Sequence, residues 1–255
     1  MPTWLAAGLW GLLGGGALVL GALVAWFARV PRAVIAAVMA FGSGVLISAV
    51  AFDLMAEAAH TGGLPATAVG FLGGSLAYLA ANALLARHGA RHRKRSGGAG
   101  DEQQPSEQEQ SGSGAAIAIG ALLDGIPESV VLGIGLLGGG SVSLSVLAAV
   151  FISNVPEGLS SAAGMKAKGR PASYVFGVWG GIAVVSALAS LAGYALLGGA
   201  APEVIAVITA VAAGAILTMI ADTMIPEAFE RAQLFTGLIT AVGFLTAFAV
   251  EQLGG

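Results

Sequence analysis

Seven carboxylates fall inside stretches of sequence that are otherwise apolar enough to cross a lipid bilayer: Asp53, Glu57, Asp124, Glu128, Glu157, Asp222 and Glu227. All eleven Lys and Arg residues lie outside these stretches, so no basic side chain can pair with the acids at the same depth. An acidic residue at the centre of a membrane helix costs about 2.5–3.5 kcal/mol, and such residues commonly mark ion or proton pathways. We therefore expect these carboxylates to be neutralised by protons or by bound cations.

Two short motifs, "DGIPES" (124–129) and "SNVPEG" (153–158), bring several kinds of oxygen atom close together. Asp124 and Glu128 are four residues apart and share one face of a helix, as do Ser153 and Glu157. Carboxylate, amide and hydroxyl oxygens are ligands that hard divalent cations accept. The motifs predict a metal site made by Asp124, Glu128, Ser153, Asn154 and Glu157.

A proline precedes the glutamate in both motifs. Pro127 and Pro156 have no amide hydrogen, so each leaves the carbonyl four residues earlier without its usual helical donor. We predict that both helices break at these prolines and that the freed backbone oxygens line a cavity. The alternative is a pair of proline kinks in packed helices, whose protonated glutamates only hydrogen-bond to their neighbours.

The elements that must carry these residues are membrane-spanning helices. Of the 255 residues, 56% are hydrophobic and 10% are charged, whereas a soluble domain usually has about 25% charged residues. A span needs about 20 apolar residues, which predicts an all-α integral membrane protein. We expect eight transmembrane helices, with acids only in the second, fourth, fifth and seventh; the predicted spans are 5–28, 33–59, 64–87, 115–137, 142–165, 172–197, 203–229 and 233–251. The absence of cysteine excludes disulfides and thiolate metal sites.

The basic residues occur only in alternate connections between the predicted spans, as follows: Arg29 and Arg32; Arg87, Arg91, Arg93, Lys94 and Arg95; Lys166, Lys168 and Arg170; and Arg231. By the positive-inside rule these connections are cytoplasmic. We predict a multi-pass protein of the cell (inner) membrane with both termini outside. The segment 88–114 is polar and of low complexity, and we expect a disordered cytoplasmic loop. His88 and His92 could collect metal there, but a solvated basic flank is the favoured interpretation.

Weak internal symmetry divides the predicted spans into a 3+2+3 inverted repeat. The two motifs align at an offset of 29 residues, and segment 44–58 aligns with 214–228 at an offset of 170. Inverted repeats that meet near the bilayer midplane are typical of transporters. The expected units are spans 1–3 (residues 1–87), the loop (88–114), spans 4 and 5 with the metal site (115–168), and spans 6–8 (169–255). Asp53 and Glu57 are expected near the outer mouth of a transport pathway, with Asp222 and Glu227 leading to the inner one.

With these motifs in this topology, the sequence resembles the ZIP (Zrt-, Irt-like protein) family of divalent-metal transporters of bacteria. The resemblance covers nearly the whole chain and includes the "IPEA" that ends the seventh span. In the family the fourth-span motif reads His-Asn-x-Pro-Glu-Gly, so Asp124 replaces its His and Gly125 its Asn. Val184 stands where some bacterial relatives have a sixth-span glutamate.

The resemblance implies alternating-access transport of a divalent metal toward the cytoplasm, with metal bound at the midplane between the fourth and fifth helices. Zn²⁺ is the leading transported substrate, with Fe²⁺, Mn²⁺ and Cd²⁺ as alternatives. Family members are generally homodimers in which spans 1, 4, 5 and 6 move past spans 2, 3, 7 and 8. We expect membrane lipids and metal ions as partners, no nucleic acid and no organic cofactor.

Two other classes of function are open to the same residues. A proton- or sodium-coupled carrier of another cationic solute would also use a pathway of acids. A metal-dependent intramembrane enzyme is the weaker alternative, because the sequence has no His-Glu-x-x-His and no Gly-x-Ser-x-Gly motif. We therefore do not expect an enzyme.

Overall fold

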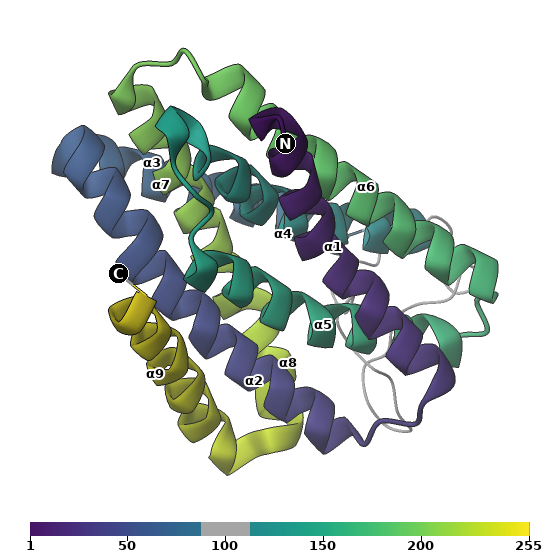
Figure 1. Cartoon of the computed structure of the whole chain (residues 1–255). Coiled ribbons are helices and arrows are strands. Elements are labelled where there is room, and N and C mark those ends of the chain that lie inside the picture. The colour runs from purple at the N-terminus through teal and green to yellow at the C-terminus, as the bar shows by residue number, and fades with distance from the viewer. Residues whose placement is uncertain (88–112, 255) are drawn as a thin grey trace.

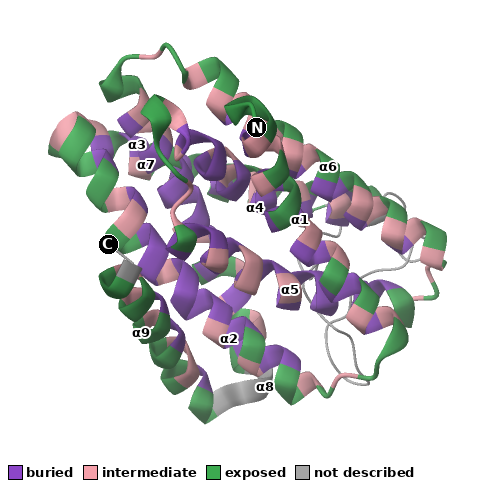
Figure 2. Cartoon of the chain, viewed as in Figure 1, coloured by how far each residue is buried: buried purple, intermediate pink, exposed green. Residues whose placement is uncertain are grey.

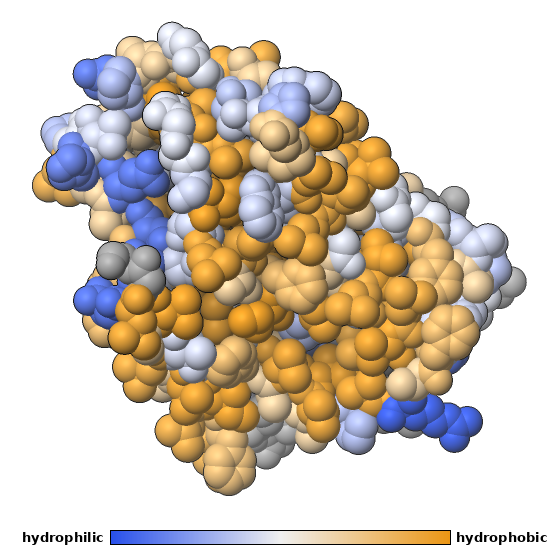
Figure 3. All heavy atoms as spheres, viewed as in Figure 1, coloured by the Kyte–Doolittle hydropathy of each residue, from blue (hydrophilic) through white to orange (hydrophobic). Residues whose placement is uncertain are grey.

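The computed structural model describes residues 1–87 and 113–254, which form a bundle of long helices joined by short connections (Figure 1). Seven helical segments of the described residues are long and apolar enough to cross a membrane. They are Thr3–Phe27, Arg32–Ala86, Ala115–Ile134, Leu144–Ala167, Ala172–Leu197, Pro202–Phe229 and Thr236–Leu253. Figure 3 shows apolar side chains over the middle of the visible face and polar ones toward two opposite ends. The chain is therefore a multi-pass membrane helical bundle.

One of these segments is far longer than a single crossing needs. Arg32–Ala86 has 55 residues and consists of α2 (Arg32–Ala49), a π-helical turn η1 (Val50–Leu54) and α3 (Met55–Ala86). A straight helix of this length would measure about 80 Å, against a hydrocarbon core of about 30 Å. Within α3, Gly63 has φ 73° and ψ 167° and lies two residues before Pro65. Glycine accepts this conformation without steric cost, so the segment consists of two helices that meet at Gly63.

The helices pack as two interlocked groups. The first helix group contains α1 (Thr3–Phe27), α4 (Ser113–Ile134), α5 (Leu144–Ala167) and α6 (Ala172–Leu197). The second helix group contains α2, α3, α7 (Pro202–Met219), α8 (Ile225–Ala232) and α9 (Thr236–Gly254). Figure 2 shows that buried residues line the sides on which these helices face one another.

Glycines explain why each group is tightly interlocked. A Cβ atom added to Gly21 of α1 would lie 2.1 Å from the Val155 carbonyl oxygen of α5, and one added to Gly214 of α7 would lie 2.0 Å from the Phe71 oxygen of α3. Small residues permit such close backbone contact in membranes. Among the described glycines, every approach under 3.0 Å to another helix stays within one group, whereas the approach of Gly42 in α2 to Ser153 in α5 is 3.1 Å. The boundary between the groups is therefore less tightly interlocked than either interior, and it divides the helices as the family resemblance implies.

Two π-helical turns lie at related positions in the second helix group. They are η1 (Val50–Leu54) and η4 (Ile220–Met224), which begin 170 residues apart (220 − 50). This offset is the one at which segments 44–58 and 214–228 align. The close contacts repeat in the same way, because Gly44 packs on the Thr240 carbonyl of α9 as Gly214 packs on α3.

Packing relates α4 and α5 at a different offset from the one in the motif alignment. Gly133 of α4 packs on the Ser190 carbonyl of α6, and Gly158 of α5 packs on the Leu18 carbonyl of α1. These equivalent contacts are 25 residues apart (158 − 133), not 29. The two Pro-Glu pairs are thus displaced from each other by about one helical turn relative to the packing symmetry.

The predicted breaks at Pro127 and Pro156 are wrong. Both prolines lie inside continuous helices, α4 and α5. A proline removes one helical hydrogen bond, and neighbouring helices can hold the remaining turns in place. The predicted boundaries otherwise agree within a few residues, and the sixth span, Ala172–Leu197, matches at both ends. Most of the predicted loop, including His88 and His92, lies outside the described residues, but α4 already begins at Ser113.

Basic side chains meet helix ends at one end of the bundle. Lys166, near the end of α5, donates to the Trp26 carbonyl oxygen near the end of α1 at 2.6 Å. Its Nζ also lies 5.3 Å from the centre of the Trp26 ring. Figure 1 shows the α1–α2 and α5–α6 connections at this end, and the α4–α5 and α6–α7 connections at the opposite one. The alternation of basic connections is therefore a real separation in space.

Candidate metal site and pathway

All five predicted metal ligands are buried on α4 and α5. The exposed fraction is 2% for Asp124 and Glu128, 0% for Ser153, and 3% for Asn154 and Glu157. Three of these side chains are carboxylates in the least hydrated part of the molecule, where a charge is stable only with strong partners. Sequence reasoning thus found the buried acids of these two helices correctly.

Hydrogen bonds fix which atoms of these side chains remain available as ligands. Asn154 donates from Nδ2 to the Gly14 carbonyl of α1 at 3.0 Å, which leaves its amide oxygen as the ligand atom. Ser153 donates to the Val150 carbonyl one turn earlier, also at 3.0 Å. The Tyr78 hydroxyl of α3 donates to Asp124 Oδ1.

Glu128 borders a very small cavity between the two helix groups. The cavity measures about 10 Å³, about the least space that holds one water molecule. Its other walls are apolar side chains of α2, η1, α4, α5 and α7, among them Ala149 and Ile216. Both carboxylate oxygens of Glu128 are buried.

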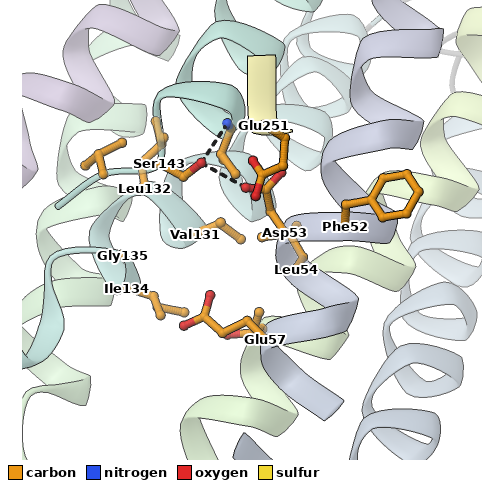
Figure 4. Close-up of a pocket in the computed structure, with 13 residues that line it drawn as sticks. Phe52, Asp53, Leu54, Glu57, Val131, Leu132, Ile134, Gly135, Ser143 and Glu251 are labelled. Atoms are coloured by element: carbon orange, nitrogen blue, oxygen red, sulfur yellow. Dashed lines mark hydrogen bonds between the residues drawn. The ribbon is translucent and has the colours of Figure 1, made fainter. Parts of the chain in front are cut away.

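A larger pocket of about 270 Å³ lies beside the α4–α5 connection (Figure 4). Asp53 and Glu57 line it from η1 and α3, as the predicted outer mouth requires, and Glu251 lines it from α9. Figure 4 shows Asp53, Glu251 and Ser143 converging at one side of the pocket, with Glu57 apart from them. The sequence therefore placed Asp53 and Glu57 in a shared cavity correctly.

Three apolar residues line both the pocket and the Glu128 cavity: Leu54 of η1, Val131 of α4 and Val146 of α5. Each is at most 6% exposed. Leu54 follows Asp53 directly, so the same π turn contributes an acid to the pocket and an apolar side chain to its inner wall. We call Leu54, Val131 and Val146 the apolar partition, because they separate the acids of the pocket from Glu128.

Serine hydroxyls join the pocket acids. Ser143 and Ser145, at the start of α5, each lie 2.9 Å from Asp53 Oδ1. Ser145 also lies 2.6 Å from Glu251 Oε2, and its one hydrogen can serve only one of the two acids at a time. The oxygen atoms of four side chains thus meet at this edge of the pocket.

Sequence reasoning missed Glu251, and the expectation that the last span has no charged residue is wrong. Glu251 lies inside α9 and is partly buried against the pocket. Its position inside the predicted span 233–251 was a sufficient signal, because an acid there has the same cost as in the other spans. Ser143 and Ser145 gave no signal, since two serines beside a glycine run read as a solvated connection.

The two acids predicted for the inner pathway have different environments. Glu227 of α8 is partly buried, and its Oε1 accepts a hydrogen bond from Ser160 of α5 at 3.4 Å. Asp222, on the π turn η4, is exposed on the surface of the bundle. The structure therefore connects Glu227 with the helix of the Pro-Glu motif and leaves Asp222 apart from it.

Within the described residues, no three His, Asp or Glu side chains lie close enough together to hold a metal ion. α4 and α5 contact each other over only a short stretch and pack mainly on other helices. A divalent ion between them would need the neutral oxygens of Ser153 and Asn154 or a closer approach of the acids.

No protein-family model matches the chain, and no curated protein matches it. The functional argument consequently depends on the residues and the geometry described above.

Proposed function

We propose that this protein is a carrier of divalent metal cations of the ZIP type, with Zn²⁺ as the leading cargo and Fe²⁺, Mn²⁺ and Cd²⁺ as alternatives. The observation that carries the proposal is the burial of Asp124, Glu128 and Glu157 in a membrane bundle whose Lys and Arg residues all lie outside the spans. A dehydrated divalent cation is a guest that makes such groups tolerable.

In this proposal the chain has eight spans, because Arg32–Ala86 supplies two that meet at Gly63. The cation enters at Asp53, Glu57 and Glu251 and passes the apolar partition. It then binds Asp124, Glu128 and Glu157 with neutral oxygens from Ser153 and Asn154. Glu227 marks the way toward the basic, cytoplasmic end.

Movement of the first helix group along the second would complete the binding site and open each end in turn. The looser packing across the group boundary supports this motion, and the interlocked glycines support rigid groups on either side. A homodimer in the inner membrane is the proposed assembly.

Zinc uptake into proteoliposomes tests the proposal. A ligand worth about 1.4 kcal/mol changes affinity about tenfold, so we expect E128Q and E157Q each to lower uptake at limiting zinc at least about tenfold. E203Q is the matched control, because Glu203 is exposed at the start of α7 and should leave uptake unchanged. Equal uptake by wild type, E128Q and E157Q would reject the site, and no uptake of any divalent ion by wild type would reject the cargo.

A further inference from the structure

Hydrogen bonds from hydroxyls to carboxylates cross the boundary between the helix groups at three levels. At the pocket, Ser143 and Ser145 of α5 lie 2.9 Å from Asp53, and Ser145 lies 2.6 Å from Glu251. At the motif, Tyr78 of α3 donates to Asp124 of α4. Toward the basic end, Ser160 of α5 donates to Glu227 of α8. We call these contacts the boundary hydrogen bonds.

Polar contacts inside each group have a different chemistry. Ser190 of α6 donates to the Ala7 carbonyl of α1 at 2.8 Å, Asn154 of α5 to the Gly14 carbonyl of α1, and Ser75 of α3 to the Gly214 carbonyl of α7. These acceptors are backbone carbonyls rather than ionisable groups. A cation that binds carboxylates would therefore weaken contacts between the groups and leave the contacts within them intact.

Tyr78 is the most enclosed donor at the boundary. Its side chain is 2% exposed, and it joins α3, which packs tightly on α7, to Asp124 of the first helix group. A carboxylate that donates its lone pairs to a divalent ion loses acceptor strength toward a hydroxyl. The Tyr78 contact and a cation at Asp124 are thus in competition for the same oxygen atoms.

We propose that Tyr78 is a positioning residue that holds Asp124 and, with the other boundary hydrogen bonds, keeps the two helix groups together until a cation binds. The cation then displaces the hydroxyl and favours the alternative arrangement of the groups, because a ligand shifts an equilibrium by its differential affinity for the two states. The cation step rests on the proposed function, whereas the hold exerted by Tyr78 does not require it.

Distance measurement between spin labels tests this inference. The sequence has no cysteine, so L64C and L196C label only the exposed positions on α3 and α6, one in each helix group. In metal-free protein we expect one dominant distance for wild type. Y78F removes a hydrogen bond to a charged group, which should change the ratio of the two arrangements about tenfold and reveal a second distance. Saturating zinc should produce the same second distance in wild type.

Y194F is the matched control, since Tyr194 lies on α6 within the first helix group. Its distance distribution should equal that of wild type; a shift like that of Y78F would overturn the inference as general loosening. Unchanged distances in Y78F would also overturn it, even if wild type transports zinc. A shift in Y78F without a response of wild type to zinc would keep the role of Tyr78 and reject the metal cargo. If Y78F does not assemble, the variant S143A/S145A carries the same test at the pocket.

Discussion

At the scale of single residues, the arrangement of Asp53 and Leu54 on one π turn is the most informative feature. Asp53 faces a pocket with two further acids, and Leu54 helps to close the wall between that pocket and Glu128. A cation attracted by the pocket therefore reaches the motif only when three apolar side chains move apart. Because hydrated ions do not cross a dry apolar contact, this wall would control access to the buried acids.

L54A should open the apolar partition. We expect the thiol of A149C, which borders the Glu128 cavity and is the only cysteine in the chain, to react about tenfold faster with a small water-soluble reagent, since each 1.4 kcal/mol of opening free energy is tenfold. The substitution should also lower the free energy of unfolding by about 2–5 kcal/mol. L18A is the control, because Leu18 is equally buried in α1 but lies outside the partition. Equal labelling rates in L54A and L18A would contradict this role of Leu54.

Residue types alone identified the buried acids, since Asp124, Glu128 and Glu157 have no other reason to occur in apolar spans. Their partners could not be found in this way. Tyr78 and Asp124 are 46 positions apart, and Ser145 and Glu251 are 106 apart. Which of many hydroxyls faces which acid depends on helix rotation and packing, and an unaligned sequence does not contain that information in readable form.

At the scale of elements, the irregular backbone occurs in a different pair of helices from the one predicted. The prolines of α4 and α5 are accommodated in continuous helices, whereas π turns interrupt the segments of the second helix group at 50–54 and 220–224. Proline is visible in a sequence because its ring removes a donor. A π turn has no such marker, since it arises from packing around ordinary residues, and the 170-residue offset was its only trace.

G214A should damage the packing of α7 on α3. Its new Cβ would lie 2.0 Å from the Phe71 carbonyl oxygen, so the helices must separate. We expect the free energy of unfolding to fall by about 1–3 kcal/mol, as is usual for overpacked cores, measured by thermal unfolding in detergent. G181A on α6 provides the comparison, because nothing lies within 4 Å of its added Cβ; it should be neutral or stabilising. Equal unfolding temperatures for the two variants would contradict the interlocked packing.

At the scale of the whole molecule, composition and charge placement defined the class of protein. The apolar surface, the long helices and the separation of basic connections agree with one another. What the sequence did not define was the division into two groups, because that depends on which glycines face which backbone. Forty glycines are present, and only their contacts show which of them join helices.

Labelling of single cysteines from one side of the membrane tests the orientation. By the positive-inside rule, L64C and L196C should react with an impermeant maleimide on intact cells. R87C, at the end of α3, should react only after the membrane is permeabilised. The reverse pattern would invert the proposed direction of the pathway, and labelling of all three from outside would contradict the alternation of the connections.

The paired π turns also have a consequence for how this protein tolerates insertions and deletions. An α-helix advances about 100° per residue, so the length of each turn sets the azimuth of everything that follows it. Deleting one residue within 50–54 would swing Glu57 about a quarter of a circle away from the pocket without altering the composition of the span. Related chains should therefore vary freely in their connections while keeping the residue count between each π turn and its acid fixed.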